Sequence, residues 1–369
     1  MSAVLPLPPG PPPRFEGRAG VERIGEFAER IDVRSPAEFA EDHMPGAVNL
    51  PVLDDAERAK VGTIYVQVSA FEARKVGAAI VARNIARIIE THALDKPREW
   101  SPLVYCWRGG QRSRALVRVL AEIGWRAWQL DGGYRAYRRH VVATLTTLPQ
   151  RFDYRVVCGL TGAGKSRLIA ALAEEGAQTL DLEMLARHRG SLLGDLPGDP
   201  QPSQKSFESQ LAAALAALDP ARLVFVECES RKIGNLQLPD ALLTTMRASS
   251  CVRLDTPASL RVAMLKTEYA HFIDGPTGFV ERLTHLTPVY GKKTIERWRE
   301  AATRRDADAL VAELLERHYD PMYTRSLAQN FPRAATALVV HANDASEANF
   351  RALARDVIDR TRAHAPATV

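Results

Sequence analysis

The sequence predicts an α/β protein with two consecutive domains, each built on a mainly parallel sheet. Short apolar runs that end in turn or polar residues alternate with segments of helical periodicity, and the alternation occurs twice along the chain. With 369 residues, the chain is long enough for two domains of ordinary size, each with its own core. We therefore expect a sheet domain at 16–140, a linker at 141–153 and a doubly wound domain at 154–369.

Each expected domain contains the strand and helix patterns that such a sheet requires. The segment 113–124 places leucine, valine and isoleucine at helical spacing and ends at Gly124, and another helix runs from Lys165 to Glu175. A further helix is expected at 71–90. The strands are expected at 30–35, 102–106, 126–133, 154–160, 178–183, 222–230, 250–256 and 336–342.

The composition is that of a globular enzyme of the cytoplasm. Charged residues make up 25% of the chain and hydrophobic residues 46%. The four cysteines form no Cys-x-x-Cys pair, which argues against a disulfide framework and a structural zinc site. No apolar stretch reaches the ~20 residues that a membrane span needs, so no membrane partner is expected. The proline-rich residues 1–15 do not resemble a signal peptide and are expected to form a mobile leader.

Positive charge is concentrated between Cys106 and Arg155. The net charge of the chain is only +5, yet this segment holds ten arginines, no lysine and three acidic residues. Such a local excess favours a polyanionic partner, although a solvated basic face would have the same composition. The candidate binding residues for a polyanion are Arg135, Arg138 and Arg139.

Cys106 lies in a setting that suits a reactive thiolate. It ends the apolar run 102–106, and a glycine-containing loop leads from it to a helix that is expected to begin near Ser113. Glycines allow successive backbone N–H groups to form an anion nest, and a helix start adds partial positive charge. We therefore expect a catalytic, nucleophilic cysteine in an anion cradle. The cradle residues are expected to be Arg108, Gly109, Gly110 and Arg112.

Two other interpretations of Cys106 stay open at this level. The cysteine could be a small buried hydrophobic residue at a strand end, which is the interpretation that suits Cys158, Cys228 and Cys251. The five residues between Cys106 and Arg112 also match the spacing of cysteine phosphatases. The sequence reveals no obvious general acid for phosphatase chemistry.

Residues 159–166, GLTGAGKS, match the G-x-x-x-x-G-K-[ST] pattern of a P-loop. The motif follows an apolar strand and opens a helix, which is the context that phosphate binding requires. The backbone N–H groups wrap phosphate oxygens, the lysine places charge on the terminal phosphate, and the hydroxyl can hold a magnesium ion. The expected diphosphate-binding residues are Gly159, Gly162, Gly164, Lys165 and Ser166.

A second strand of this domain is expected to supply carboxylates. Glu227 and Glu229 follow four apolar residues, a Walker-B-like position at which a carboxylate orders Mg²⁺ or its water. Alternating carboxylates at a strand end could instead be surface residues. The candidate metal-binding residues are Ser166, Glu227 and Glu229.

Three polar stretches, 188–194, 200–208 and 229–234, carry more functional groups than a connecting loop needs. They could line a substrate site, or they could be solvated loops. The candidate substrate-binding residues in them are His188, Arg189, Gln201, Gln204, Lys205, Arg231 and Lys232.

The first domain resembles rhodanese domains in two segments. DVRSPAEFAEDHMPGAVNLP (32–51) resembles their upstream signature, and LDGGYRAY (130–137) resembles their closing segment. This resemblance covers about the first 140 residues. It implies a rhodanese-like fold whose loop cysteine carries sulfur or selenium as a persulfide or perselenide.

The order of CWRGGQRS, GLTGAGKS, HRGSLLG and PQPSQK resembles the tRNA 2-selenouridine synthase family along nearly the whole chain. That family typically has consecutive acids on the second-domain strand, where this chain has Cys228 between two glutamates. The resemblance implies that wobble 2-thiouridine of tRNA is first S-geranylated with geranyl diphosphate. Selenium from selenophosphate, carried as a perselenide on Cys106, then replaces the geranylated sulfur.

The same resemblance implies the partners and cofactors. They are tRNA, geranyl diphosphate and selenophosphate, the last delivered by an enzyme that produces it. Trp107, Tyr134 or Tyr137 could stack a flipped uridine, although such aromatic residues more often belong to a core. We expect no tightly bound organic cofactor, and Mg²⁺ is the candidate metal.

Two functions of other classes use the same parts. One is an ATP-dependent enzyme, either a kinase or a tRNA sulfurtransferase. The sulfurtransferase would carry sulfur as a persulfide on Cys106. The other is a regulatory module whose idle rhodanese-like domain senses an anion. An aliphatic or aromatic pocket beside the P-loop favours the selenouridine synthase, ATP turnover favours the sulfurtransferase, and full activity without Cys106 favours the regulatory module.

Overall fold

The computed structural model describes residues 17–191, 194–196, 198–270, 283–304 and 306–363. The predicted leader at 1–15 lies outside these residues. The chain divides into two compact units: the first runs up to Thr144 and includes Glu208–Gln210, and the second holds Leu145–Phe207 and the residues from Leu211 onward. The expected linker at 141–153 contains the end of helix α5 (Gly133–Thr147) and a 3-10 helix (Leu148–Arg151).

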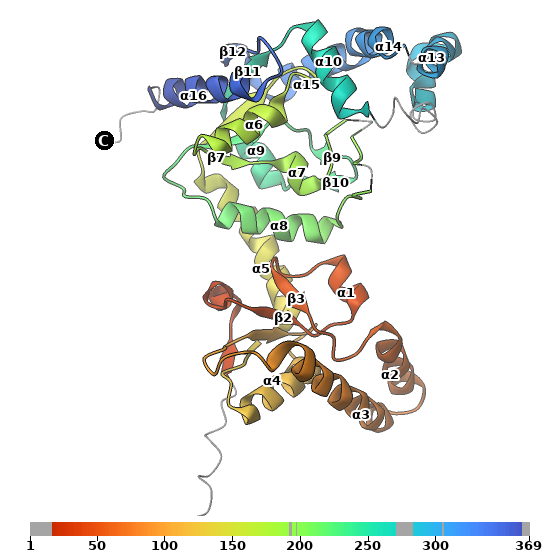
Figure 1. The fold of residues 1–369 in the computed structure, drawn as a ribbon, viewed down its shortest axis with the longest axis vertical. Coiled ribbons are helices and arrows are strands. Elements are labelled where there is room, and N and C mark those ends of the chain that lie inside the picture. Colours follow the sequence, from red (N-terminus) through yellow and green to blue (C-terminus); the bar gives the residue numbers. More distant parts are fainter. Residues whose placement is uncertain (1–16, 192–193, 197, 271–282, 305, 364–369) are drawn as a thin grey trace, which may run out of the picture. The chain divides into compact units, whose positions relative to one another are not determined.

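The first unit contains a five-stranded sheet with the order β1-β5-β4-β2-β3, and all of its strands run parallel (Figure 1). The predicted strands at 30–35, 102–106 and 126–133 correspond to β2, β4 and β5. The sequence did not reveal β1 and β3, which lie at the two edges of the sheet and are less completely buried than the central strand β4. The strands are β1 (Gly17–Ala19), β2 (Arg30–Asp32), β3 (Ala47–Asn49), β4 (Leu103–Tyr105) and β5 (Trp128–Leu130).

Helices of the first unit pack their apolar residues on this sheet. Leu116, Val117 and Leu120 share a buried cluster with Ile31 and Val104, so the central strands are covered by helix α4. The expected helix at 113–124 begins two residues earlier, at Gln111. The helices are α1 (Pro36–Glu41), α2 (Asp55–Gln67), α3 (Ala70–Ile88), α4 (Gln111–Ile123) and α5, with a 3-10 helix at Val21–Glu26 and a π-helix at Ile89–Ala93.

The second unit contains another parallel five-stranded sheet, with the order β12-β11-β6-β8-β7. A two-stranded antiparallel hairpin of β9 and β10 lies apart from it. All five strands predicted for this domain are present. Their bounds, and those of the hairpin, are β6 (Tyr154–Cys158), β7 (Gln178–Leu180), β8 (Val224–Glu227), β9 (Lys232–Ile233), β10 (Leu236–Gln237), β11 (Ser250–Asp255) and β12 (Leu338–His341).

Helices α6 and α16 lie side by side and bury apolar residues against this sheet (Figure 1). Leu168 and Leu172 of α6 and Phe350 and Val357 of α16 share one cluster with Val252 of β11. The helices are α6 (Lys165–Glu174), α7 (Leu182–Ala186), α8 (Gln204–Ala216), α9 (Asp240–Ala248), α10 (Ala258–Glu268), α13 (Thr287–Thr303), α14 (Ala307–Leu314), α15 (Asp320–Asn330) and α16 (Glu347–Ala363), with 3-10 helices at Thr284–Leu286 and Pro332–Thr336 and a π-helix at Leu315–Tyr319.

The predicted α/β fold class is confirmed, and the topology explains where ligands can bind. In the second sheet, β8 and β7 lie on one side of β6, and the later strands β11 and β12 lie on its other side. Such a reversal opens a crevice at the carboxyl end of the central strand. The loop that contains Lys165 leaves β6 at this point. In the first sheet, Cys106 likewise follows the central strand β4.

Candidate functional site

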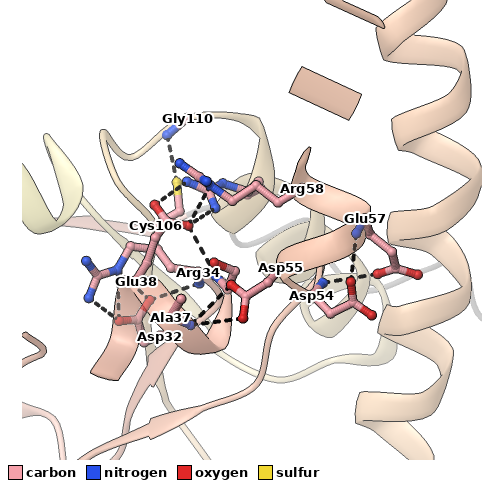
Figure 2. A network of polar contacts seen from close by, with 12 residues as sticks. Asp32, Arg34, Ala37, Glu38, Asp54, Asp55, Glu57, Arg58, Cys106 and Gly110 are labelled. Carbon is pink, nitrogen blue, oxygen red and sulfur yellow. Dashed lines mark hydrogen bonds and ion pairs between the residues drawn. The ribbon is translucent and has the colours of Figure 1, made fainter. Parts of the chain in front are cut away.

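Cys106 lies at the end of β4 with its sulfur turned toward the start of α4. Its side chain is nearly buried, with a relative exposure of 3%. Its Sγ accepts hydrogen bonds from the backbone N–H of Gly110, at 3.3 Å, and from Oγ of Ser113, at 3.2 Å (Figure 2). Both groups can donate to the sulfur, so the loop presents hydrogen-bond donors to the reacting atom of Cys106.

The Cys106 loop is supported by β5 and by the residues just after that strand. Gln129 of β5 is buried, and its Nε2 lies within donating distance of the carbonyl oxygens of Gly109, at 2.9 Å, and Gly110, at 3.0 Å. A Cβ on Gly133, whose φ is 57°, would lie 2.2 Å from the carbonyl oxygen of Cys106. Only glycine fits such a position without moving the loop.

The arginines around this loop are not equivalent. Arg112 donates to the Glu38 carboxylate at 2.7 and 3.3 Å, so its charge is engaged by a partner. Arg108 is exposed. Arg58 of α2, which the sequence did not suggest, also binds Glu38, with its Nε at 3.1 Å from Oε2 (Figure 2).

The P-loop follows β6 and leads into α6. Gly162 and Gly164 have φ values of 74° and 92°, a backbone region that favours glycine. Lys165 donates from Nζ to the carbonyl oxygen of Gly159, at 3.2 Å, and lies over the ring of Tyr323. Ser166 donates to Oε2 of Glu183 at 2.7 Å. The five predicted diphosphate-binding residues thus lie on the loop after β6 and in the first turn of α6.

A cavity of about 470 Å³ opens beside this loop. One part of its wall is polar and includes Lys165, Ser166, His188, Arg189 and Glu229. Another part is aliphatic and aromatic. Its apolar lining residues are Met184, Leu196, Leu265, Tyr269, Tyr323, Leu327 and Phe331.

Several acidic residues lie at or near the polar wall, and the structure distinguishes between the two that the sequence predicted, Glu227 and Glu229. Glu229 lines the cavity with an exposure of 7%, and burial together with the charge of Glu183 raises its pKa well above the usual range. Glu227 is fully buried and is absent from the lining; its Oε2 accepts from the backbone N–H of Leu182, at 3.0 Å. Burial and the charge of Asp181 raise the pKa of Glu227 as well.

The sequence did not single out Glu183 and Asp181, although both line the cavity. They come after β7, and no local motif marks them. Among the described residues, no group of three or more His, Cys, Asp or Glu side chains is arranged to hold a metal ion. Ser166, Glu183 and Glu229 nevertheless place oxygen atoms together in the cavity wall, which is the donor type that Mg²⁺ prefers.

Most of the candidate substrate-binding residues lie outside the cavity, and two of them bond to the backbone of neighbouring segments. Of the seven, only His188 and Arg189 line the cavity. Gln201 bonds to the backbone of Ala186, Ile233 and Asn235, and Gln204 bonds twice to the backbone of Gln237. Lys205 is half-buried, Arg231 is exposed and pairs with Asp240, and Lys232 is exposed.

The candidate polyanion-binding residues lie on α5. Arg135 and Arg139 are exposed, whereas Arg138 is half-buried and pairs with Glu208, which belongs to the same unit. The aromatic residues considered for base stacking are mostly internal. Tyr134 and Tyr137 are buried, and Trp107 stacks on Tyr134 with 5.2 Å between ring centroids.

The three remaining cysteines are buried in the second unit. Two of their thiols have carbonyl acceptors as partners: Cys158 donates to the carbonyl oxygen of Val156, and Cys251 to that of Ser249. Hydrogen bonding to Cys228 and Cys251, together with burial, raises the pKa of Cys158. The surroundings of Cys158 therefore favour the neutral thiol.

None of the helices in the described parts of the chain has the length and apolar character needed to span a membrane.

The fold and the two sites define a two-domain protein in which a rhodanese-like domain with a loop cysteine precedes a P-loop domain. Residues 22–140 match the rhodanese-like domain family, and residues 152–283 match the family described as the tRNA 2-selenouridine synthase AAA domain. The chain is 37% identical over 265 residues to the tRNA 2-selenouridine synthase of Nitrosomonas europaea, and the match covers 70% of this chain and 67% of that protein. The chain belongs to the tRNA 2-selenouridine synthase family and is a transferase, which confirms the resemblance of its motifs.

A solved structure is also similar to part of the chain. It is the N-terminal domain of a protein from Clostridium difficile 630 that is described as ATP/GTP binding. It is 33% identical, its TM-score is 0.31, and the match covers 34% of this chain and 99% of that one.

Proposed function

We propose that the chain converts wobble 2-thiouridine of tRNA into 2-selenouridine in two steps, S-geranylation with geranyl diphosphate followed by selenium transfer from selenophosphate. Membership of the family supports the overall conversion. The single observation that supports the two-step route is the cavity in which a phosphate-binding loop adjoins an apolar wall. Since tRNA is its substrate, we place the protein in the cytoplasm.

The cavity suits a ligand with a diphosphate at one end and a hydrocarbon chain at the other. Lys165 and the P-loop N–H groups can receive the diphosphate, and Arg189 lies in the same wall. Leu265, Tyr269 and Leu327 provide apolar surface that a nucleoside would not require. Under this proposal the diphosphate departs as a leaving group, and Lys165 stabilises the charge that develops on it.

Mg²⁺ would be held by Ser166 with Glu183 or Glu229, and the ion would supply further charge stabilisation at the diphosphate. Glu227 is assigned a different role. Its carboxyl group bonds to the first turn of α7, the helix that carries Glu183. Glu227 therefore orients that helix instead of contacting the ion.

Cys106 acts in the second step. Geranylation turns the sulfur of the base into a group that can leave as geranylthiol, and selenium then takes its place. The Cys106 sulfur attacks C2 of the geranylated base, and the C2–S bond breaks so that geranylthiol departs. Selenium of selenophosphate then attacks the same carbon and displaces Cys106, and water takes the phosphoryl group as the Se–P bond breaks. The Gly110 and Ser113 groups hold the attacking sulfur in place.

The tRNA is proposed to bind across the exposed arginines of α5. Arg135 and Arg139 are accessible to phosphates, whereas Arg138 is partly engaged by Glu208. Each phosphate contact releases counterions, so affinity should fall steeply as salt rises. Charge reversal at Arg135 and Arg139 should weaken binding without unfolding the protein. An affinity that stays flat between low and high salt would contradict this assignment.

The two-step proposal is tested by separating the steps with two variants. Lys165→Ala removes the charge that offsets the departing diphosphate, so geranylated tRNA should form about a hundredfold to a thousandfold more slowly. Cys106→Ser leaves the P-loop intact, so geranylated tRNA should form and accumulate while 2-selenouridine does not appear. The readout is nucleoside mass spectrometry of tRNA incubated with each variant, geranyl diphosphate and selenophosphate.

Two control variants complete the experiment. Lys292→Ala removes an exposed lysine of the second unit that does not line the cavity. Cys251→Ala removes a cysteine from the unit that does not hold Cys106. Both variants should leave both steps intact. A folded Cys106→Ser variant that makes no geranylated product would contradict the division of labour. A requirement for ATP in the first step would favour an ATP-dependent sulfurtransferase that uses a Cys106 persulfide.

A further inference from the structure

Glu38 lies between two guanidinium groups at the edge of the Cys106 loop. Its carboxylate accepts from Arg112 of α4 and from Arg58 of α2, and Glu38 itself belongs to α1. Three elements that are separate in the sequence therefore meet here (Figure 2). The Glu38 side chain is 12% exposed, while that of Arg58 is 52% exposed. The pair of arginines is thus reachable from solvent on the Arg58 side.

The charge at this position is unbalanced. Two guanidinium groups share one carboxylate, so one positive charge is left over beside the loop that holds Cys106. Burial alone would raise the pKa of Glu38, but hydrogen bonding and attraction from Arg112 and Arg58 outweigh it and lower the pKa. Glu38 is therefore an internal anion that is held by the two arginines at neutral pH.

We propose that Arg58 and Arg112 form a clamp for a tetrahedral phosphate-type oxyanion, and that Glu38 fills the clamp until such an anion replaces it. The inference rests on the proposed role of Cys106 in the selenium-transfer step, because the selenium donor in that step carries a phosphate group. Guanidinium groups match pairs of oxygens on phosphate in a planar fork, and a dianion attracts them more strongly than a single carboxylate does. The clamp positions the oxyanion next to the sulfur and takes part in no bond change.

The alternative is that Glu38 only braces α1 against α4. Glu38 also accepts from the backbone N–H of Ser35 at 3.2 Å, which is part of the capping of α1, so a structural contribution exists. A brace and a clamp differ in one measurable respect. Only a clamp makes the reactivity of Cys106 depend on added phosphate through Arg58.

The test measures alkylation of Cys106 in the full chain, without tRNA, by peptide mass spectrometry. The probe is inorganic phosphate, titrated at constant ionic strength, and the reagents are anionic iodoacetate and neutral iodoacetamide. Phosphate in the clamp should slow labelling of the unmodified protein in a saturable way. In Arg58→Ala, the phosphate concentration for half protection should rise about tenfold to a hundredfold, as expected for loss of a charge-assisted contact.

Glu38→Gln removes the internal anion, so it should strengthen phosphate binding, whereas Arg58→Ala should weaken it. Half protection should occur at lower phosphate, which a structural brace would not produce. The ratio of iodoacetate to iodoacetamide rates should also rise, because a negative charge near the sulfur has been removed. Arg83→Ala is the matched control, because Arg83 pairs with Glu57 and is 71% exposed. It should leave both readouts unchanged.

Equal phosphate protection in the unmodified protein and in Arg58→Ala would overturn the clamp. Because Arg58 is half exposed, its removal should not prevent folding, so the test holds even if Glu38→Gln is unstable. None of these measurements involves selenium, geranyl diphosphate or tRNA. The clamp can therefore fail while geranylated tRNA still accumulates in Cys106→Ser, and the two proposals are separable.

Discussion

Replacing Ser113 by alanine should slow the reaction of Cys106 with alkylating reagents. Ser113 is fully buried, and its hydroxyl is one of two groups that donate to the Cys106 sulfur. Gln129 donates to the Ser113 oxygen at 2.8 Å, so the hydroxyl hydrogen has two acceptors within reach, the Cys106 sulfur at 3.2 Å and the carbonyl oxygen of Gly110 at 3.3 Å. Alanine removes this donor and keeps the backbone of α4.

The size of the effect depends on the charge on the sulfur. A hydrogen bond to a charged group contributes about 1.5–3 kcal/mol, and each 1.4 kcal/mol corresponds to about a factor of ten. The second donor, the N–H of Gly110, stays in place. We therefore expect the low end of this range, about a tenfold lower rate of alkylation at neutral pH. Gln129 keeps the carbonyl oxygens of Gly109 and Gly110 as acceptors, so no buried donor is left unpaired.

The assay is the pseudo-first-order rate of iodoacetamide labelling at Cys106, measured by mass spectrometry of the peptide. Ser101→Ala is the control, because Ser101 belongs to the same unit and donates one hydrogen bond to the carbonyl oxygen of Arg126, at 2.9 Å. It should label at the rate of the unmodified protein. If folded Ser113→Ala labels within about twofold of the unmodified protein, the hydroxyl does not stabilise the charged sulfur and the reasoning is refuted.

Three further predictions concern other parts of the chain. Cys106 should label faster at neutral pH than Cys158, because the Cys106 sulfur accepts from the N–H of Gly110 while hydrogen bonding and burial raise the pKa of Cys158; equal rates would remove the argument for an activated thiol. Asp32→Asn should lower the free energy of unfolding of the first unit by about 3–5 kcal/mol, since it leaves the buried charge of Arg34 without its carboxylate partner. Asp131→Asn in the exposed pair with Arg18 should cost less than about 1 kcal/mol. Urea denaturation of both variants measures this difference, and similar losses would contradict it. Because the pKa of Glu227 is raised in the folded protein, its contribution to stability is greatest below the unfolded-state pKa and declines as pH rises toward the folded value. Glu227→Gln should therefore lose less stability than the unmodified protein as pH rises from about 5 to about 8 in parallel thermal melts, and an unchanged pH dependence would refute the assignment.

The two central motifs could be found from the sequence because each is contiguous. A strand, a run of glycines and a helix start occur in order around GLTGAGKS, and the same order surrounds Cys106. Local chemistry of this kind does not depend on distant residues, since the backbone N–H groups that bind the anion belong to the loop itself. The α/β class and the family resemblance rested on such segments, and both are confirmed. The roles of the individual site residues stay predictions.

Tertiary structure decided which side chains complete each site. Arg58 and Glu38 reach the Cys106 loop from two other helices, and Gln129 reaches it from a neighbouring strand. Glu183 reaches Ser166 from the short helix after β7, while Glu227, which the sequence favoured equally with Glu229, is turned into the interior. In each case the deciding factor is the packing of segments that are far apart along the chain. A linear pattern describes only the neighbours of a residue along the chain, whereas the charges and donors that set its chemistry come from residues that fold against it.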